Sequence, residues 1–416
     1  MTTTDTVDPA WVADRYRRSL SAGRARLAAM LGGQVEVHSE GAWLTTSDGE
    51  RYLNAGGYAV LFTGARHPLV VEEVQRQLHT HPVGTRLFLE PTAARAAEAL
   101  LGVAPAGLER VYFGCTGAEA VETAIKLARV NGRRRLIATT GGFHGKTLGA
   151  LSITGRPAFQ DPFRPLLPGV VTVPYGDTGA LAAELERYPG EACVVLEPVQ
   201  GENGVVIPPP GYLTSVRALC SEYGALLVVD EIQTGLGRLG AWWGCDRERV
   251  RPDILLSGKC LGGGVIPVSA VLAPPEVFAP LDRDPFLHTS TFSAVPIAMA
   301  AVCGAIRAIT EDDLVARAAA LGTRLRDGLT EIAARRLAAH GCRVRGQGLL
   351  IGVELADPGL TGALLVELVA RHVVANLSLN CDRVLRLTPP AVLTDAEADL
   401  LLETFDEAAS SPVFRH

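Results

Sequence analysis

Lysine is scarce in this chain of 416 residues. Of 39 basic side chains, only Lys126, Lys146 and Lys259 are lysines, and every other basic position is an arginine. A guanidinium stays protonated at any working pH, whereas the pKa of an ammonium group shifts readily on burial. The three lysines are therefore the first positions at which to look for chemistry.

Other absences exclude whole classes of protein. The longest nearly uncharged run, AVPIAMAAVCGAI, is shorter than the roughly 20 residues that a membrane helix needs. The N-terminus carries early acidic residues and no apolar core, which is not typical of a signal peptide. The eight cysteines are scattered singly, with no C-x-x-C pair, which favours reduced thiols over disulfides or a metal site. We expect a cytoplasmic protein without a metal and without a membrane partner.

The net charge of −6 is spread over interspersed acidic and basic residues, which argues against nucleic acid as a partner. The length exceeds what one hydrophobic core usually holds, so two domains are expected. The middle of the chain repeats a short apolar run, a glycine-containing turn and a helix-like segment; the runs are RVYFGC, RRLIATT, ACVVLEP and ALLVVDE. This alternation predicts an α/β fold with a mainly parallel sheet covered on both faces.

The two ends of the chain have different patterns. An arginine-rich amphipathic helix is predicted from Trp11 to Leu31, and QVEVHSEGAWLTTSDGERYL predicts an antiparallel hairpin. A long helical stretch followed by VRGQGLLIGVEL and VLRLTPP is typical of an α+β unit. We predict a small domain built from residues 1–62 and 306–416, and a large domain formed by residues 63–305.

The three lysines lie in different surroundings. Lys126 follows Glu122 by four residues on a predicted helix, which favours a solvated i,i+4 ion pair. Lys146 lies in a loop after a strand, where a role near a site and a plain surface position are both open. Lys259 lies between DILLSG and LGGG, where desolvation would lower its pKa and glycines would let a flat ligand approach. Such a lysine can form a Schiff base with a carbonyl, although a chance loop lysine is the alternative.

Pyridoxal phosphate, a Schiff-base cofactor, would require further partners. Its ring nitrogen needs a carboxylate, which Asp230 at the end of LLVVD could supply; the alternative for Asp230 is an N-cap of the following turn. Its phosphate needs N–H donors, which Thr116, Gly117 and Ala118 offer at the start of a helix. Phe143 could stack on the ring, although core packing would explain this phenylalanine equally well.

Together these segments resemble a known family. CTGAEAVETAIKLAR, GGFHGKTLGALSITG, LEPVQGENGVVIPPPGYL, VVDEIQTGLGRLG, PDILLSGKCLGGG and HTSTFSAVP are, in this order, similar to the class III aminotransferases of pyridoxal-phosphate fold type I. The resemblance runs from about residue 35 to the C-terminus. It looks closest to putrescine aminotransferases, with ornithine and acetylornithine aminotransferases next. It implies pyridoxal 5′-phosphate as cofactor, held in the large domain, and a smaller α+β domain from the two termini.

The resemblance also implies roles for the cofactor residues. Lys259 would carry the Schiff base and shuttle a proton between substrate Cα and the cofactor, while Asp230 would hold the pyridinium nitrogen. Gln233 would hydrogen-bond near the phenolic oxygen, and His144 would lie beside the stacked Phe143. The backbone amides of Gly117 and Ala118 would hold the phosphate, with Thr116 next to them. Thr291 would reach the phosphate of a neighbouring subunit, which implies a homodimer with shared active sites; a tetramer is left open.

Three further residues are implied at the substrate. Arg386 matches an arginine that binds a substrate carboxylate, and Glu202 matches a glutamate that pairs with it when an amine lacking a nearby carboxylate binds. Glu197 belongs to the same pocket, more as a support for Asp230 than as a substrate contact. The chain departs from the family at Cys115–Ala118, where Asn-Ser-Gly-Thr is usual, and at Ser293–Pro296, where Gly-Gly-Asn-Pro is usual.

The implied activity is transfer of an amino group from a terminal amine, a diamine or ω-amino acid, to a 2-oxo acid such as 2-oxoglutarate or pyruvate by a ping-pong mechanism. The alternative keeps the cofactor but changes the reaction to racemisation, decarboxylation or carbon–carbon bond formation at Cα. A non-catalytic protein on the same scaffold is disfavoured because the cofactor positions are nearly all filled.

Overall fold

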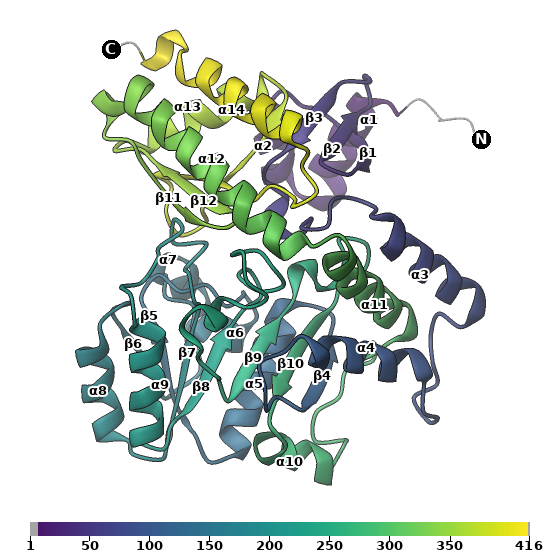
Figure 1. Cartoon of the computed structure of the whole chain (residues 1–416), viewed down its shortest axis with the longest axis vertical. Helices are drawn as coiled ribbons and strands as arrows, with labels where there is room; N and C mark the ends of the chain where they lie inside the picture. Colours follow the sequence, from purple (N-terminus) through teal and green to yellow (C-terminus); the bar gives the residue numbers. More distant parts are fainter. Residues whose placement is uncertain (1–6, 415–416) are drawn as a thin grey trace.

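A seven-stranded sheet forms the centre of the larger part of the molecule (Figure 1). The structure is a computed structural model, and it describes residues 7–414. Only β10 runs antiparallel to its neighbours. The strand order is β4 (Arg110–Gly114), β10 (Ser269–Ala273), β9 (Ile254–Ser257), β8 (Leu226–Asp230), β7 (Ala192–Leu196), β5 (Arg135–Thr139) and β6 (Val170–Val173).

Both faces of this sheet are buried, which explains the continuous apolar runs in the sequence. In β8, Leu227 and Val229 belong to the core on one face, together with Val216 of α9 (Tyr212–Glu222). Val228 between them belongs to the core on the opposite face, together with Val121 of α5 (Gly117–Val130). The prediction of a mainly parallel sheet covered by helices on both faces is therefore confirmed.

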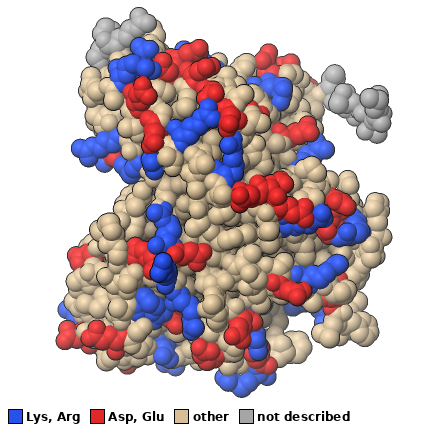
Figure 2. All heavy atoms as spheres, in the orientation of Figure 1, with Lys and Arg blue, Asp and Glu red and all other residues tan. Residues whose placement is uncertain are grey.

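The remaining helices around this sheet follow the predicted alternation. They are α3 (Pro68–Thr80), α4 (Pro91–Gly102), α6 (Leu148–Ser152), α7 (Pro157–Gln160), α8 (Thr178–Arg187), α10 (Pro275–Arg283) and α11 (Pro296–Glu311). No helix within residues 7–414 is long and apolar enough to cross a membrane. On the face shown in Figure 2, acidic and basic side chains are interspersed.

A smaller α+β part is built from both ends of the chain, as predicted. The N-terminal strands pair with a C-terminal one, because β13 runs parallel to β3. The first sheet contains β1 (Glu36–Glu40), β2 (Trp43–Thr46), β3 (Arg51–Asn54) and β13 (Val373–Val374). The second contains β11 (Arg343–Gln347), β12 (Leu350–Glu354), β15 (Val384–Leu387) and β14 (Asn376–Leu377).

Three helices complete this part: α12 (Leu314–Arg336), α13 (Pro358–Val369) and α14 (Asp395–Ala409). In Figure 1 they lie with both termini above the large sheet. The exact domain limits stay a prediction, and residue 305 falls inside α11.

The predicted helix from Trp11 to Leu31 is wrong in its continuity. The chain forms α1 (Pro9–Arg15), a π-helical turn (Tyr16–Leu20) and α2 (Ala22–Met30), with no buried residue in any of them. The break is at Ser21, whose backbone is extended and whose hydroxyl accepts the N–H of Arg24 at 3.2 Å. A serine that caps a new helix competes with continuation of the old one. The predicted hairpin is present and gains a third strand, β3.

Gly304 of α11 marks the closest approach between α11 and α3. A Cβ added at Gly304 would lie 2.7 Å from the Cα of Val70 and 3.0 Å from the carbonyl oxygen of Leu69. We therefore expect Gly304→Ala to lower the free energy of unfolding by roughly 1–3 kcal/mol through overpacking. In urea titrations, Gly362→Ala in α13 is the matched control, because a Cβ there meets nothing within 4 Å and alanine favours a helix. A Gly304 variant as stable as that control would contradict the close packing.

Candidate active site

The candidate site lies where β7, β8 and β9 end. These parallel strands finish side by side, so Glu197 just after β7, Asp230 at the end of β8 and Lys259 shortly after β9 meet at one edge of the sheet. A cavity of about 240 Å³ opens there. It is lined by Gly117, Ala118, Phe143, His144, Gly145, Glu197, Glu202, Asp230, Ile232, Gln233 and Lys259.

Lys259 reaches this cavity from an uncommon backbone conformation. Its φ is 45°, in the left-handed region that a side-chain-bearing residue seldom adopts. Such strain persists where the surrounding structure fixes it, and it is frequent at functional sites. Desolvation lowers the pKa of the Lys259 ammonium, with the charge of Glu202 opposing the shift. Burial therefore favours the free amine, as predicted from the flanking apolar residues.

Asp230 is held by two donors at the end of β8. One carboxylate oxygen accepts the backbone N–H of Ile232 at 3.1 Å, and the other lies 2.7 Å from Nδ1 of His144. Burial alone would lower the pKa of His144, but its hydrogen bond to Asp230 and the charge of that carboxylate raise it. The imidazole thus favours its protonated form and fixes the orientation of Asp230. The alternative, an N-cap of the following turn, is present as well, because the contact with the N–H of Ile232 is a bond of this kind.

Glu197 lines the cavity and holds the loop that carries Phe143. Its carboxylate accepts the backbone N–H of Phe143 at 2.9 Å, and its side chain is 4 % exposed. Burial raises the pKa of Glu197 to about 7, while the nearby His144 opposes the shift. The contact with Phe143 supports the view of Glu197 as a pocket support.

The start of α5 leaves two backbone amides free of protein partners. Glu119 accepts the N–H groups of Cys115 and Thr116 at 2.7 and 2.9 Å, and Thr116 accepts the N–H of Glu119 at 3.2 Å. Within residues 7–414, the N–H groups of Gly117 and Ala118 have no hydrogen bond to protein, and both residues line the cavity. They form the anion-binding end of a helix. Glu119, which sequence reasoning missed, completes the capping box at this helix start, while the N–H groups of Gly117 and Ala118 have no partner among the described residues because they lie in the first turn.

Further features fit a planar cofactor with polar edges. Within the described chain, Oε1 of Gln233 and Nε2 of His144 are buried without a hydrogen-bond partner, which is costly unless a ligand supplies one. The cavity is also kept open by glycine, because a Cβ on Gly145 would lie 2.9 Å from that of Ala118. Ile232 was missed by sequence reasoning, although its spacing of two from Asp230 could have indicated it.

Arg386 and Glu202 form a buried ion pair beside the cavity. Nη1 of Arg386, whose side chain is 0 % exposed, contacts a carboxylate oxygen of Glu202, and the other oxygen accepts the N–H of Leu379 at 3.0 Å. Burial would raise the pKa of Glu202, but the charges of Arg386 and Lys259, together with the hydrogen bond from the N–H of Leu379, lower it overall. Leu379 is another contact that the sequence did not indicate. The pairing implied by the resemblance is thus present in the fold.

Some predicted residues lie elsewhere. Thr116 is exposed and caps α5, and it does not line the cavity. Thr291 is exposed and lines a different cavity, of about 590 Å³. Its role toward a neighbouring subunit stays a prediction. Lys146 is exposed, with its ammonium nitrogen 4.0 Å from the centre of the Phe159 ring, which favours the surface interpretation.

The predicted ion pair between Lys126 and Glu122 is wrong. Glu122 instead accepts the hydroxyl of Thr147 at 2.6 Å and the N–H of Ala150 at 3.1 Å. These donors come from the segment that follows β5, so tertiary contacts override the helical spacing. The ammonium group of Lys126 contacts Nδ1 of His288 at 2.8 Å.

A sheet edge that presents a desolvated lysine, an oriented aspartate and a helix start is typical of enzymes that use pyridoxal phosphate. The family model described as aminotransferase class-III matches residues 31–409, and the chain belongs to this family. Among solved structures it is similar to ornithine aminotransferase from Toxoplasma gondii, with 30 % identity, a TM-score of 0.90, and 97 % of this chain and 94 % of that one covered. It is also similar to an (S)-enantioselective ω-transaminase from Thermomicrobium roseum, with 28 % identity, a TM-score of 0.89, and 98 % and 99 % covered.

These findings confirm several predictions. The protein is a pyridoxal-phosphate-dependent aminotransferase of fold type I. The alternative of a non-transamination reaction gains no support from them. The particular resemblance to putrescine aminotransferases and the roles of individual residues stay predictions.

The raised pKa of Glu197 leads to a stability prediction. A carboxyl whose pKa is higher in the folded than in the unfolded state contributes stability below about pH 4.5, and this is lost as the pH rises to about 7. We expect Glu197→Gln, which cannot ionise, to gain roughly 1–3 kcal/mol relative to wild type between these pH values. Urea unfolding of the cofactor-free protein at pH 5 and pH 8 measures the difference. A pH-independent difference would contradict the burial of an ionisable Glu197.

Proposed function

We propose that this aminotransferase takes its amino group from a terminal amine, a diamine or ω-amino acid, and passes it to a 2-oxo acid such as 2-oxoglutarate or pyruvate. The observation that carries the proposal is the buried pair of Arg386 and Glu202 beside the cavity that contains Lys259. Paired, the two charges leave a pocket that accepts an amine with an apolar chain. Separated, they expose a guanidinium that binds a carboxylate in bidentate geometry.

The residues that line the cavity would have different roles toward the cofactor and the substrate. Pyridoxal phosphate, when bound, supplies an electron sink for the carbon that loses or gains the amino group. Lys259 would hold the cofactor and, as a free amine, would move the proton at the substrate carbon. Asp230, oriented by His144, would hold the ring nitrogen protonated. Gly117 and Ala118 would bind the phosphate through their N–H groups.

Other residues would orient the ring and exclude water. Phe143 and Ile232 both line the cavity as apolar walls, and Gln233 has an unpaired amide oxygen for a polar group at the ring edge. Glu197, by accepting the N–H of Phe143, would fix the loop that carries this wall. Such positioning limits the geometries available to the bound substrate.

We also propose a homodimer in which Thr291 completes the partner's site, with a tetramer left open. Large apolar side chains are exposed in and around the cavity that Thr291 lines. Phe88, which lines it, is 81 % exposed. Leu87, next to Phe88 in the chain, is 86 % exposed, and Phe286, five residues before Thr291, is 85 % exposed. Exposed apolar surface of this kind is typical of an interface. The reduced cytoplasm is the compartment we propose, in accordance with the free thiols.

The role of Arg386 can be tested by substitution. In Arg386→Ala, we expect KM for 2-oxoglutarate to rise by roughly 100-fold, because a buried charge-assisted hydrogen-bond partner is lost. KM for a diamine donor should change by less than about three-fold, since in that half of the reaction the guanidinium faces Glu202 and does not contact the donor. Steady-state kinetics against both substrates measures the two effects.

Arg383→Ala is the matched control, because Arg383 lies near Arg386 in the chain but is half exposed and pairs with Glu354 at 3.5 Å. Equal losses for donor and acceptor in Arg386→Ala would refute the substrate assignment.

A further inference from the structure

Residues 284–295 connect α10 to α11 and carry Thr291 at the tip of a turn. The backbone N–H of Ser293 donates to the carbonyl oxygen of Ser290 at 3.2 Å, which closes a β-turn with Thr291 and Phe292 at its corners. Both corner residues are exposed, Phe292 to 55 %. The turn therefore projects from the surface of the chain, and the contacts at its base determine where Thr291 lies.

Ser293 anchors one side of this turn to the large sheet. Its hydroxyl donates to the carbonyl oxygen of Phe113 in β4 at 2.6 Å. The next residue, Ala294, has a φ of 52°, in the left-handed region where a residue with a side chain is strained. Such strain persists only where neighbouring contacts hold the backbone in place. Glycine is usual in the family at both positions, and a glycine has no hydroxyl, so this contact depends on the serine.

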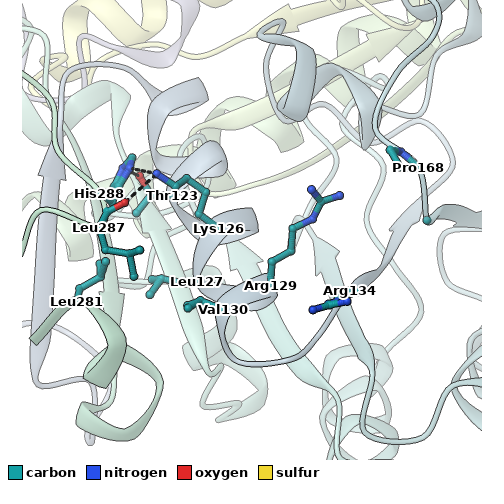
Figure 3. A pocket seen from close by; sticks show the side chains of 11 residues that line it. Thr123, Lys126, Leu127, Arg129, Val130, Arg134, Pro168, Leu281, Leu287 and His288 are labelled. Atoms are coloured by element: carbon teal, nitrogen blue, oxygen red, sulfur yellow. Dashed lines mark hydrogen bonds between the residues drawn. The ribbon is translucent and has the colours of Figure 1, made fainter. Parts of the chain in front are cut away.

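His288 anchors the other side of the turn to α5. Figure 3 shows Lys126 and Thr123 directed at its ring, with Nδ1 2.8 Å from the ammonium nitrogen and Nε2 2.8 Å from the hydroxyl oxygen. Because an ammonium group can only donate, Nδ1 accepts, and Nε2 carries the proton that it donates to Thr123. The same ammonium group donates to the carbonyl oxygen of Leu287 at 3.3 Å.

The surroundings of His288 favour the neutral ring that these bonds require. Burial and the charge of Lys126 lower its pKa. The hydroxyl of Thr123 can accept from Nε2 because it donates its own proton to the carbonyl oxygen of Glu119 at 2.8 Å. The ring also lies against Tyr112 of β4, with 4.8 Å between the ring centres. Both ring nitrogens are thus used within the chain, so His288 holds the segment and has no donor or acceptor left for a ligand.

We propose, on the basis of the homodimer proposed for this enzyme, that His288 and Ser293 are positioning residues that present the hydroxyl of Thr291 to the cofactor phosphate in the partner's site. Thr291 lies between the two anchors, so its position is fixed before the phosphate binds. A hydroxyl on a mobile turn would lose conformational freedom on binding, and anchoring the turn reduces this cost. Thr291 does not line the cavity that contains Lys259 of its own chain. Loss of an anchor therefore acts on the partner's site.

Mixed dimers separate an effect on the partner's site from an effect on the chain's own site. Co-expression with two affinity tags isolates dimers in which one subunit carries Lys259→Ala and lacks the amine that would attach the cofactor. Each such dimer has one site with attached cofactor. The loss of this cofactor after dilution of the holoenzyme is followed by its absorption band. A second substitution is then placed in one subunit or in the other.

His288→Ala and Ser293→Ala should each speed cofactor loss by about ten-fold when they are placed in the Lys259→Ala subunit, which supplies Thr291 to the remaining site. Placed in the other subunit, they should change the rate by less than about two-fold. Ser293→Ala removes only a hydroxyl, so it tests an anchor even where His288→Ala does not fold. Ser293→Thr keeps the hydroxyl and should lose cofactor as wild type does. The matched control is Thr289→Ala, because Thr289 is exposed between the two anchors and its hydroxyl makes no hydrogen bond within residues 7–414.

Thr291→Val in the same two arrangements distinguishes failure of the shared site from failure of the positioning role. If it leaves cofactor loss unchanged from the Lys259→Ala subunit, the shared site is wrong and the positioning role falls with it. If it acts across the dimer while neither His288→Ala nor Ser293→Ala does, the shared site stands and the positioning role alone is overturned. Faster loss only from the subunit that itself carries His288→Ala would show a role through α5 and would also overturn it. Adding His288→Ala to Thr291→Val in one subunit should bring no further acceleration.

Discussion

The parallel alignment of β7, β8 and β9 is the constraint on which the rest of the site depends. Because these strands run in one direction, the residues at or shortly after their ends meet at one edge of the sheet. Residues far apart in the chain, Glu197, Asp230 and Lys259, thus line one cavity. The start of α5 and the turn at Phe143 enclose the same space. Helices on both faces of the sheet keep this edge in place.

Burial then determines the charge states within the cavity. An isolated buried charge is costly, so each charged group is either paired or shifted toward its neutral form. Asp230 is paired with His144, and Glu202 is paired with Arg386. Glu197 has a raised pKa and Lys259 a lowered one. The cavity therefore offers a fixed carboxylate, a buried ion pair at its side, and an amine whose neutral form desolvation favours.

Arg238 is a buried charge that is stabilised by backbone carbonyl oxygens rather than by a carboxylate. This arginine is fully buried, and its guanidinium donates to the carbonyl oxygens of Leu349 and Pro389 at 3.2 and 2.6 Å. It also lies over the ring of Phe62 at 5.0 Å. Burial lowers the pKa of Arg238 to about 10. These contacts join the loop after β8 to the smaller part of the molecule, which also carries Arg386.

Much of the fold and the central residues could be predicted from the sequence. The ends of buried parallel strands can be located in a sequence because such strands are continuous apolar runs. Asp230, which ends the run LLVVD, could therefore be placed at a strand end. Lys259 stood out because the chain uses arginine elsewhere. Contacts between distant segments were not readable. The hydrogen bond from the N–H of Leu379 to Glu202 has no signal in the local sequence, and neither has the contact between Lys126 and His288.

The errors have local physical causes. The prediction of a continuous N-terminal helix failed because the hydroxyl of Ser21 caps the start of a new helix. Hydrophobic periodicity does not show this competition between capping and continuation of the first helix. The ion pair of Lys126 failed because Glu122 is occupied by donors from another element. Thr116 was expected at the cofactor but is used to cap α5. Polar residues at the ends of helices and strands can cap these elements or bond to other segments. Only the tertiary structure shows which of them keep a donor or acceptor free for a ligand.

The central claim is that a cofactor attached to Lys259 accepts an amino group before the second substrate arrives. It is tested most directly by mixing the enzyme, cofactor bound, with an amine donor in the absence of any 2-oxo acid. The account predicts that the absorption band of the attached cofactor disappears, with one equivalent of carbonyl product formed per subunit, and that Lys259→Ala shows neither change. Carbonyl formation by Lys259→Ala at the wild-type rate, or no half-reaction with any donor, would contradict it.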